Sequence, residues 1–138
     1  MESQSASQYL CVHENAWMFC LKPDLLIDTL ECRWILDTKW KRVDRRSSKK
    51  NYDLSQSDFY QLFAYGHKYR KGIDVPKLVL IYPYWLGLQE ALPVFQYGDG
   101  MSLWVLPFDL DNDRLVDADA AGIPLQNEVS QASLKHRP

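Results

Sequence analysis

The stretch Trp34–Lys41, with the sequence Trp-Ile-Leu-Asp-Thr-Lys-Trp-Lys, constrains this chain more than any other. Its composition predicts a β-strand, and successive side chains of a strand point to opposite faces. Asp37 and Lys39 therefore share one face, whereas Thr38 and Trp40 share the other. Burying an acid and a lysine is costly unless a metal ion or a partner compensates for it. The pattern therefore favours a functional site.

A second acid, Asp24, follows Pro23 and opens another apolar run. If residues 28–32 form a turn, the two runs make an antiparallel hairpin that brings Asp24 close to Asp37 and Lys39. Two carboxylates and a lysine at a sheet edge can form a divalent-metal site beside a basic group. Such a site suits cleavage of a phosphodiester, because a metal ion activates water and neutralises charge on the phosphate.

The spacing Pro-Asp, twelve residues, Asp-x-Lys matches the PD-(D/E)xK nuclease motif. A structural explanation stays open beside this one. Asp24 could cap a turn, and Asp37 could pair with Lys39 or Lys41 on a solvated strand face.

The remaining elements predict an α/β fold of the PD-(D/E)xK type, a central mixed sheet with a flanking helix. The near-continuous apolar run 77–82 predicts a strand buried on both faces and paired in parallel. A helix is expected from Asp58 to about Tyr69, with Ser57 or Asp58 as its cap. Gln61 and Tyr65, four residues apart, share one side of this helix. Further strands are expected over residues 8–13, 16–27 with a bend at the proline, 33–41 and 103–108.

A length of 138 residues fits one domain. We expect a disordered start over residues 1–7, a nuclease-like domain over 8–117 and a flexible tail over 118–138. No apolar run approaches the roughly 20 residues that cross a bilayer. The three cysteines form no Cys-x-x-Cys pair, and the start lacks a signal peptide. We therefore expect a cytoplasmic protein without a membrane segment.

The net charge of −2 hides an uneven distribution. Residues 33–50 carry eight basic side chains against two acids, whereas residues 101–128 carry six acids against one arginine. The basic run follows the Asp-x-Lys strand directly and could hold a DNA backbone. The alternative is a solvated loop that happens to be basic. The candidate DNA-binding residues of this run are Lys41, Arg42, Arg45 and Arg46.

Other reaction classes find no support in the sequence. There is no Gly-x-Ser-x-Gly elbow and no cysteine with an evident histidine partner, which argues against hydrolysis of ordinary esters or peptides. The chain also lacks a Gly-x-x-x-x-Gly-Lys loop, so any use of GTP or ATP must belong to another subunit.

Four phrases of the chain resemble McrC, the nuclease subunit of the McrBC methylcytosine restriction systems. They are Leu-Lys-Pro-Asp-Leu-Leu-Ile from Leu21, Ile-Leu-Asp-Thr-Lys-Trp-Lys from Ile35, Ser-Asp-Phe-Tyr-Gln-Leu-Phe-Ala-Tyr from Ser57 and Leu-Ile-Tyr-Pro from Leu80. The resemblance covers roughly residues 8–110.

The resemblance implies a Mg²⁺-dependent endonuclease, with Mn²⁺ as an alternative ion, that cleaves DNA containing modified cytosine. A McrB-like AAA+ GTPase would be its partner. Asp24 and Asp37 would be metal ligands, and Lys39 would orient or activate the attacking water. Gln61 and Tyr65 would contact DNA or help to position Asp24 and Asp37, although Tyr65 could equally be a core aromatic.

The chain also departs from this family. McrC proteins carry an amino-terminal region that docks on McrB, followed by a first core helix, and residues 1–7 match neither. The departure predicts a missing first helix, an exposed sheet face and a split, truncated or decayed protein. Two alternatives stay open: a non-catalytic remnant or interaction module, and another PD-(D/E)xK enzyme such as a junction resolvase or repair nuclease.

Overall fold

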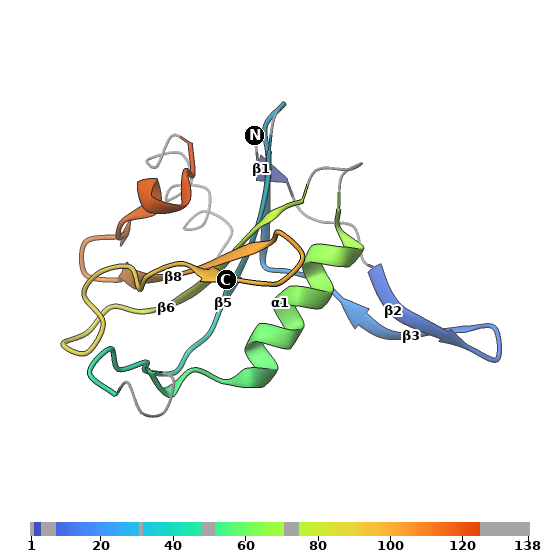
Figure 1. Ribbon diagram of the computed structural model, residues 1–138, viewed down its shortest axis with the longest axis horizontal. Coiled ribbons are helices and arrows are strands. Elements are labelled where there is room, and N and C mark those ends of the chain that lie inside the picture. The colour runs from blue at the N-terminus through green and yellow to red at the C-terminus, as the bar shows by residue number, and fades with distance from the viewer. Residues whose placement is uncertain (1, 4–7, 31, 48–51, 71–74, 125–138) are drawn as a thin grey trace.

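A computed structural model describes residues 2–3, 8–30, 32–47, 52–70 and 75–124 (Figure 1). Its centre is a mixed sheet with the strand order β1-β4-β5-β6-β8-β7, and β9 pairs with β8. The predicted mixed α/β architecture with a flanking helix is confirmed. The strands of this sheet are β1 (Glu2–Ser3), β4 (Leu25–Asp28), β5 (Arg33–Thr38), β6 (Lys77–Pro83), β7 (Phe95–Gln96), β8 (Ser102–Asp109) and β9 (Arg114–Leu115).

The centre of the sheet is parallel and its edges are antiparallel. β4 and β5 form the predicted hairpin, with Leu25 opposite Leu36. β5 pairs with β6 in parallel, and β6 pairs in parallel with β8. The buried apolar run of β6 is thus the central parallel strand, as its composition predicts. The short strands β7 and β9 were not predicted, because two residues carry no periodicity.

Helix α1 (Gln56–Lys68) covers one face of the sheet. Every second residue of the strands, such as Ile35 and Leu80, packs there with Leu62 of the helix. Gly66 faces the sheet with no room for a side chain, because an added Cβ would meet the Met101 sulfur. Ser55, rather than Ser57 or Asp58, is the N-cap, since its hydroxyl accepts from the Ser57 N–H at 3.2 Å.

The carboxyl-terminal segment covers the other face. The 3₁₀ helix η2 (Ala118–Ala121) and Ile123 pack against strand residues that include Leu36. The Trp34 indole N–H donates to the Ala121 carbonyl at 2.9 Å. The expected exposed sheet face is therefore wrong, because this face is covered. Ala118, Ala121 and Ile123, which the expected tail includes, are buried in the core. Residues 125–138 of the expected tail lie outside the described residues.

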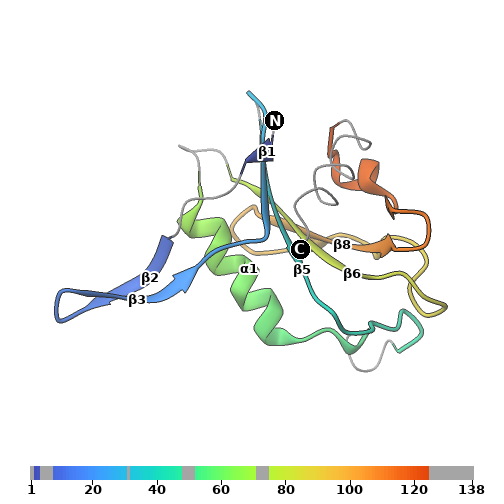
Figure 2. The ribbon, with the colours of Figure 1, turned by 180° about the vertical axis from the view of Figure 1, so that it is seen from behind.

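A two-stranded hairpin, β2 (Gln8–His13) and β3 (Ala16–Leu21), projects from the body of the molecule (Figure 2). The predicted turn at Glu14 and Asn15 is confirmed, with both residues at positive φ. Residues 16–27 do not form one bent strand, however. β3 ends at Leu21 and β4 begins at Leu25 in a different sheet; Pro23, which has no N–H to donate, lies between them.

The start of the chain also differs from the prediction. Glu2–Ser3 form β1 and pair with β4, so these two residues are not disordered. Residues 1 and 4–7 of the same expected segment lie outside the described residues. No helix in the described part of the chain is long and apolar enough to span a membrane.

Candidate functional site

Asp24 and Asp37 lie directly across from each other, one step past the last paired residues of the β4–β5 hairpin. The Asp24 N–H donates to Asp37 Oδ1 at 3.3 Å. The Asp24 carboxylate in turn accepts from the backbone N–H and the hydroxyl of Thr38, at 2.8 and 2.6 Å. The predicted approach of the two acids is therefore confirmed, and Thr38, which the sequence did not single out, fixes Asp24.

Asp37 is the one charged residue buried in the described part of the chain, with 5% of its surface exposed. The pKa of Asp37 is raised to about 6, chiefly by burial and also by the negative charge of Asp24, whereas Lys39 opposes both. The nearby negative charge means that a cation between the two carboxylates would relieve their repulsion.

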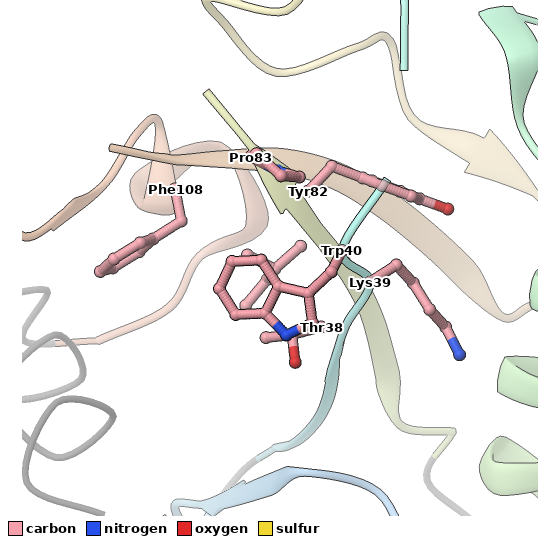
Figure 3. A pocket seen from close by; sticks show the side chains of 7 residues that line it. Thr38, Lys39, Trp40, Tyr82, Pro83 and Phe108 are labelled. Atoms are coloured by element: carbon pink, nitrogen blue, oxygen red, sulfur yellow. The ribbon is translucent and has the colours of Figure 1, made fainter. Parts of the chain in front are cut away.

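Lys39 lies on the same face as Asp37, as strand alternation predicts. Its Nζ is 3.0 Å from Asp37 Oδ2 and also donates a short hydrogen bond to Gln61 Oε1. In Figure 3, Lys39 and Tyr82 extend to one side of the sheet, whereas Trp40 and Phe108 lie on the other. The notch lined by these residues has a volume of about 10 Å³, which is room for a single water at most.

Asp58 is a third acid near the site, and sequence reasoning considered it only as a helix cap. Its two oxygens lie 3.8 Å from Lys39 Nζ and 3.5 Å from Lys41 Nζ. It also accepts from the Tyr82 hydroxyl at 3.1 Å. Asp58 precedes Gln61 by three residues, so helical spacing was the signal that could have found it.

Tyr65 is 3% exposed and belongs to the core beneath α1. Its hydroxyl donates to the Lys22 carbonyl at 3.4 Å, two residues before Asp24. Burial, then the charges of Asp37 and Asp24, raise the pKa of Tyr65, so its hydroxyl keeps its proton. Tyr65 is thus a core aromatic whose hydroxyl also holds the backbone just before Asp24.

The basic residues after β5 divide between two places. Lys41 reaches Asp58 and so belongs to the site. Arg45 pairs with Glu90 at 3.1 Å and Arg46 with Asp44 at 2.9 Å. Arg42 lies with its guanidinium 4.7 Å from the centre of the Trp85 ring. These three arginines lie near the loop after β6 and do not contact Asp24 or Asp37.

The oxygen atoms of Asp24 and Asp37 suit a hard divalent cation. Carboxylate oxygens accept several bonds each, so lone pairs remain beside the hydrogen bonds given above. Among the described residues, no three acids, histidines or cysteines cluster as a closed metal cage. Mg²⁺ is commonly held by only one or two carboxylates, with waters and phosphates completing its shell. The donor set therefore fits Mg²⁺ or Mn²⁺.

The family model for the McrBC 5-methylcytosine restriction system component matches residues 1–83. The chain belongs to this family. The McrC resemblance of the sequence is thereby confirmed, and the match includes Asp24, Asp37 and Lys39. No curated protein is significantly similar to the chain.

Among the solved structures, the following has a similar fold. It is a refined half-complex from a tetradecameric assembly of Thermococcus gammatolerans McrB AAA+ hexamers with bound McrC. The TM-score is 0.56 and the identity 13%, over 97% of this chain and 28% of the other. At this identity the likeness concerns the fold alone, and the McrBC-family chain spans less than a third of its neighbour.

Proposed function

We propose that this McrBC-family chain is a Mg²⁺-dependent DNA endonuclease domain with a PD-(D/E)xK core. The observation that carries the proposal is the buried Asp37, held between a second acid and a lysine at the end of β5. A purely structural strand gains nothing from burying such a group. The strand order and the Gln61 contact to Lys39 support the same core.

Asp24 and Asp37 would hold the metal ion. When bound, it would neutralise charge on the scissile phosphate and lower the pKa of an attacking water. Lys39, whose ammonium is held by Asp37 and Gln61, would stabilise the negative charge that develops on the phosphate oxygens. Thr38 keeps the Asp24 carboxylate turned toward β5.

The proposed substrate is duplex DNA containing modified cytosine, and the proposed partner is a McrB-like AAA+ GTPase. The family match supports a place in a restriction system. The similar fold within a complex of McrB hexamers with bound McrC supports the partner. Recognition of the modified base would belong to that partner.

Metal binding measured by calorimetry tests the site first, on folded wild type and on the Asp24→Ala/Asp37→Ala variant. We expect wild type to bind Mg²⁺ or Mn²⁺ and the double variant to bind neither. Cleavage of methylated duplex, with and without the GTPase and GTP, then tests the substrate and the partner. Wild type that folds but binds no divalent metal would contradict an autonomous nuclease and favour a non-catalytic remnant. Cutting of branched DNA alone would favour a resolvase.

A further inference from the structure

Four cations follow Lys39 in the described part of the loop after β5, and they differ in how their charges are compensated. Three of them lie against carboxylates, whereas no carboxylate in the described part of the chain lies within ion-pair distance of Arg42. The three pairs are Lys41–Asp58, Arg45–Glu90 and Arg46–Asp44. Among these four described cations, Arg42 is therefore the one whose charge is most available to a ligand.

Trp85 positions the Arg42 side chain. The guanidinium lies 4.7 Å from the ring centre, and Arg46 lies farther away, at 5.8 Å. The indole N–H donates to the Val43 carbonyl at 2.9 Å, which fixes the ring against the same loop. An arginine whose guanidinium carbon lies over an aromatic ring can still offer its N–H groups as a fork to a phosphate.

The loop that carries Arg42 is built into the fold. Val43 is fully buried in the core. The Arg45 N–H donates to the Gly87 carbonyl at 2.7 Å, and the Asp44 N–H donates to the Tyr52 carbonyl at 3.1 Å. Such anchoring reduces the entropy that a binding side chain loses when it meets its ligand.

We propose that Arg42, held over Trp85, binds a backbone phosphate of the nucleic-acid strand that passes the Asp37–Lys39 centre. Arg42 follows Lys39 by three residues, so the chain between them spans at most about 10 Å. A strand with one phosphate at Lys39 would bring a neighbouring phosphate within reach of Arg42. This inference rests on the proposed function and assigns a contact with the DNA backbone to Arg42 among the described cations of the basic loop.

Binding of the full chain to a fluorescent duplex in EDTA tests this without cleavage. Each phosphate contact contributes roughly 0.9 to the slope of log affinity against log salt. We expect Arg42→Ala to lower the slope by about 1 and the affinity about tenfold at 0.1 M salt. Arg42→Lys should keep the slope but bind more weakly, because it keeps the charge and loses the fork.

Arg46→Ala is the matched control, since Arg46 lies on the same loop and over the same ring but is paired with Asp44. It should leave the slope nearly unchanged. Trp85→Phe, checked for folding, should weaken binding and largely keep the slope. Inorganic phosphate at constant ionic strength should not displace the duplex.

The inference would be overturned if Arg42→Ala and Arg46→Ala lost the same affinity for the duplex, or if Arg42→Ala bound the duplex as wild type does. Either result would leave the nuclease proposal standing. Displacement by inorganic phosphate would also overturn it, in favour of a site for a free anion. A wild-type chain that binds no duplex at all would overturn this inference and the proposed DNA substrate together.

Discussion

Two groups of aspartates lie near the carboxyl ends of parallel strands, and their surroundings give them opposite properties. Asp24 and Asp37 lie at the end of β5, and Asp37 is buried with a pKa raised to about 6. Asp109, at the end of β8, opens an exposed turn with Asp111 and Asp113. Hydrogen bonds from Asn112 lower the pKa of Asp109.

The difference shows that the number of acids does not decide where a cation binds. The turn after β8 is the richer in aspartate, but Asp109 already accepts from the Asn112 amide at 2.8 Å and from two backbone N–H groups. The Asp109 carboxylate is therefore already stabilised by hydrogen bonds from its own turn. Asp37 instead is desolvated beside a second carboxylate and a lysine, which is the arrangement that perturbs titratable groups at functional sites.

Removing one charge from each group gives the largest expected contrast. Asp37→Asn should lower DNA cleavage at least about 100-fold, because it removes a proposed metal ligand. Asp109→Asn should leave cleavage within about twofold of wild type. Single-turnover cleavage of methylated duplex with the GTPase partner measures both. Equal activity of wild type and Asp37→Asn would contradict the proposed site.

The two groups should also affect stability with opposite sign as the pH changes. Between pH 3.8 and about 6 the folded chain keeps the Asp37 proton and the unfolded chain does not. The free energy of unfolding should therefore fall as pH rises through this window, by up to about 3 kcal/mol for a shift of two units. The pKa of Asp109 is lowered in the folded chain. Its contribution to the free energy of unfolding is therefore present at pH values above its pKa in the unfolded chain and is lost as the pH falls.

Urea unfolding at pH 4.5 and 7.5 without divalent metal measures this difference. Asp37→Asn cannot ionise, so it should lose the decline and be the more stable protein at pH 7.5. Asp109→Asn should keep the decline. A decline of the same size in Asp37→Asn would mean that another group causes it.

A smaller effect is expected at Asp58, which lies beside Lys39 and Lys41. Asp58→Asn keeps the acceptor for Tyr82 but removes the charge facing both lysines. We expect about a tenfold loss in kcat, because Lys39 is less well positioned, with KM for DNA little changed. Asp111→Asn, an exposed acid of the other group, is the control and should be neutral. A change in KM alone would indicate a role in DNA binding.

The smallest expected difference concerns the residues that hold the two aspartate regions in place. Ser55 caps the helix that carries Asp58 and Gln61, so Ser55→Ala should cost about 1 kcal/mol in the free energy of unfolding. Asn112→Ala in the exposed turn should change it by no more than about 0.5 kcal/mol. Thermal unfolding of both variants checks this, and a larger cost for Asn112→Ala would mean that the turn supports the core.

Local pattern was enough for the centre of the site. The alternation of Trp34–Lys41 placed Asp37 and Lys39 on one face, and the apolar run of β6 predicted a parallel strand buried on both sides. The interval from Asp24 to Asp37 fits a hairpin, and the observed register puts the two acids opposite each other. These features could be predicted because they depend on the alternation of strand side chains between two faces and on one short turn.

Long-range packing decided the rest. Trp34 meets Ala121 across 87 residues of sequence, and Trp85 meets Val43 across 42. No local period encodes such contacts. Sequence reasoning therefore left the second sheet face exposed and treated four cations of one loop as equivalent. The sequence by itself determined that Asp37 and Lys39 share one face of a strand and that Asp24 lies near them. Only the tertiary structure decided which charges are already compensated, because compensation depends on neighbours that folding brings together.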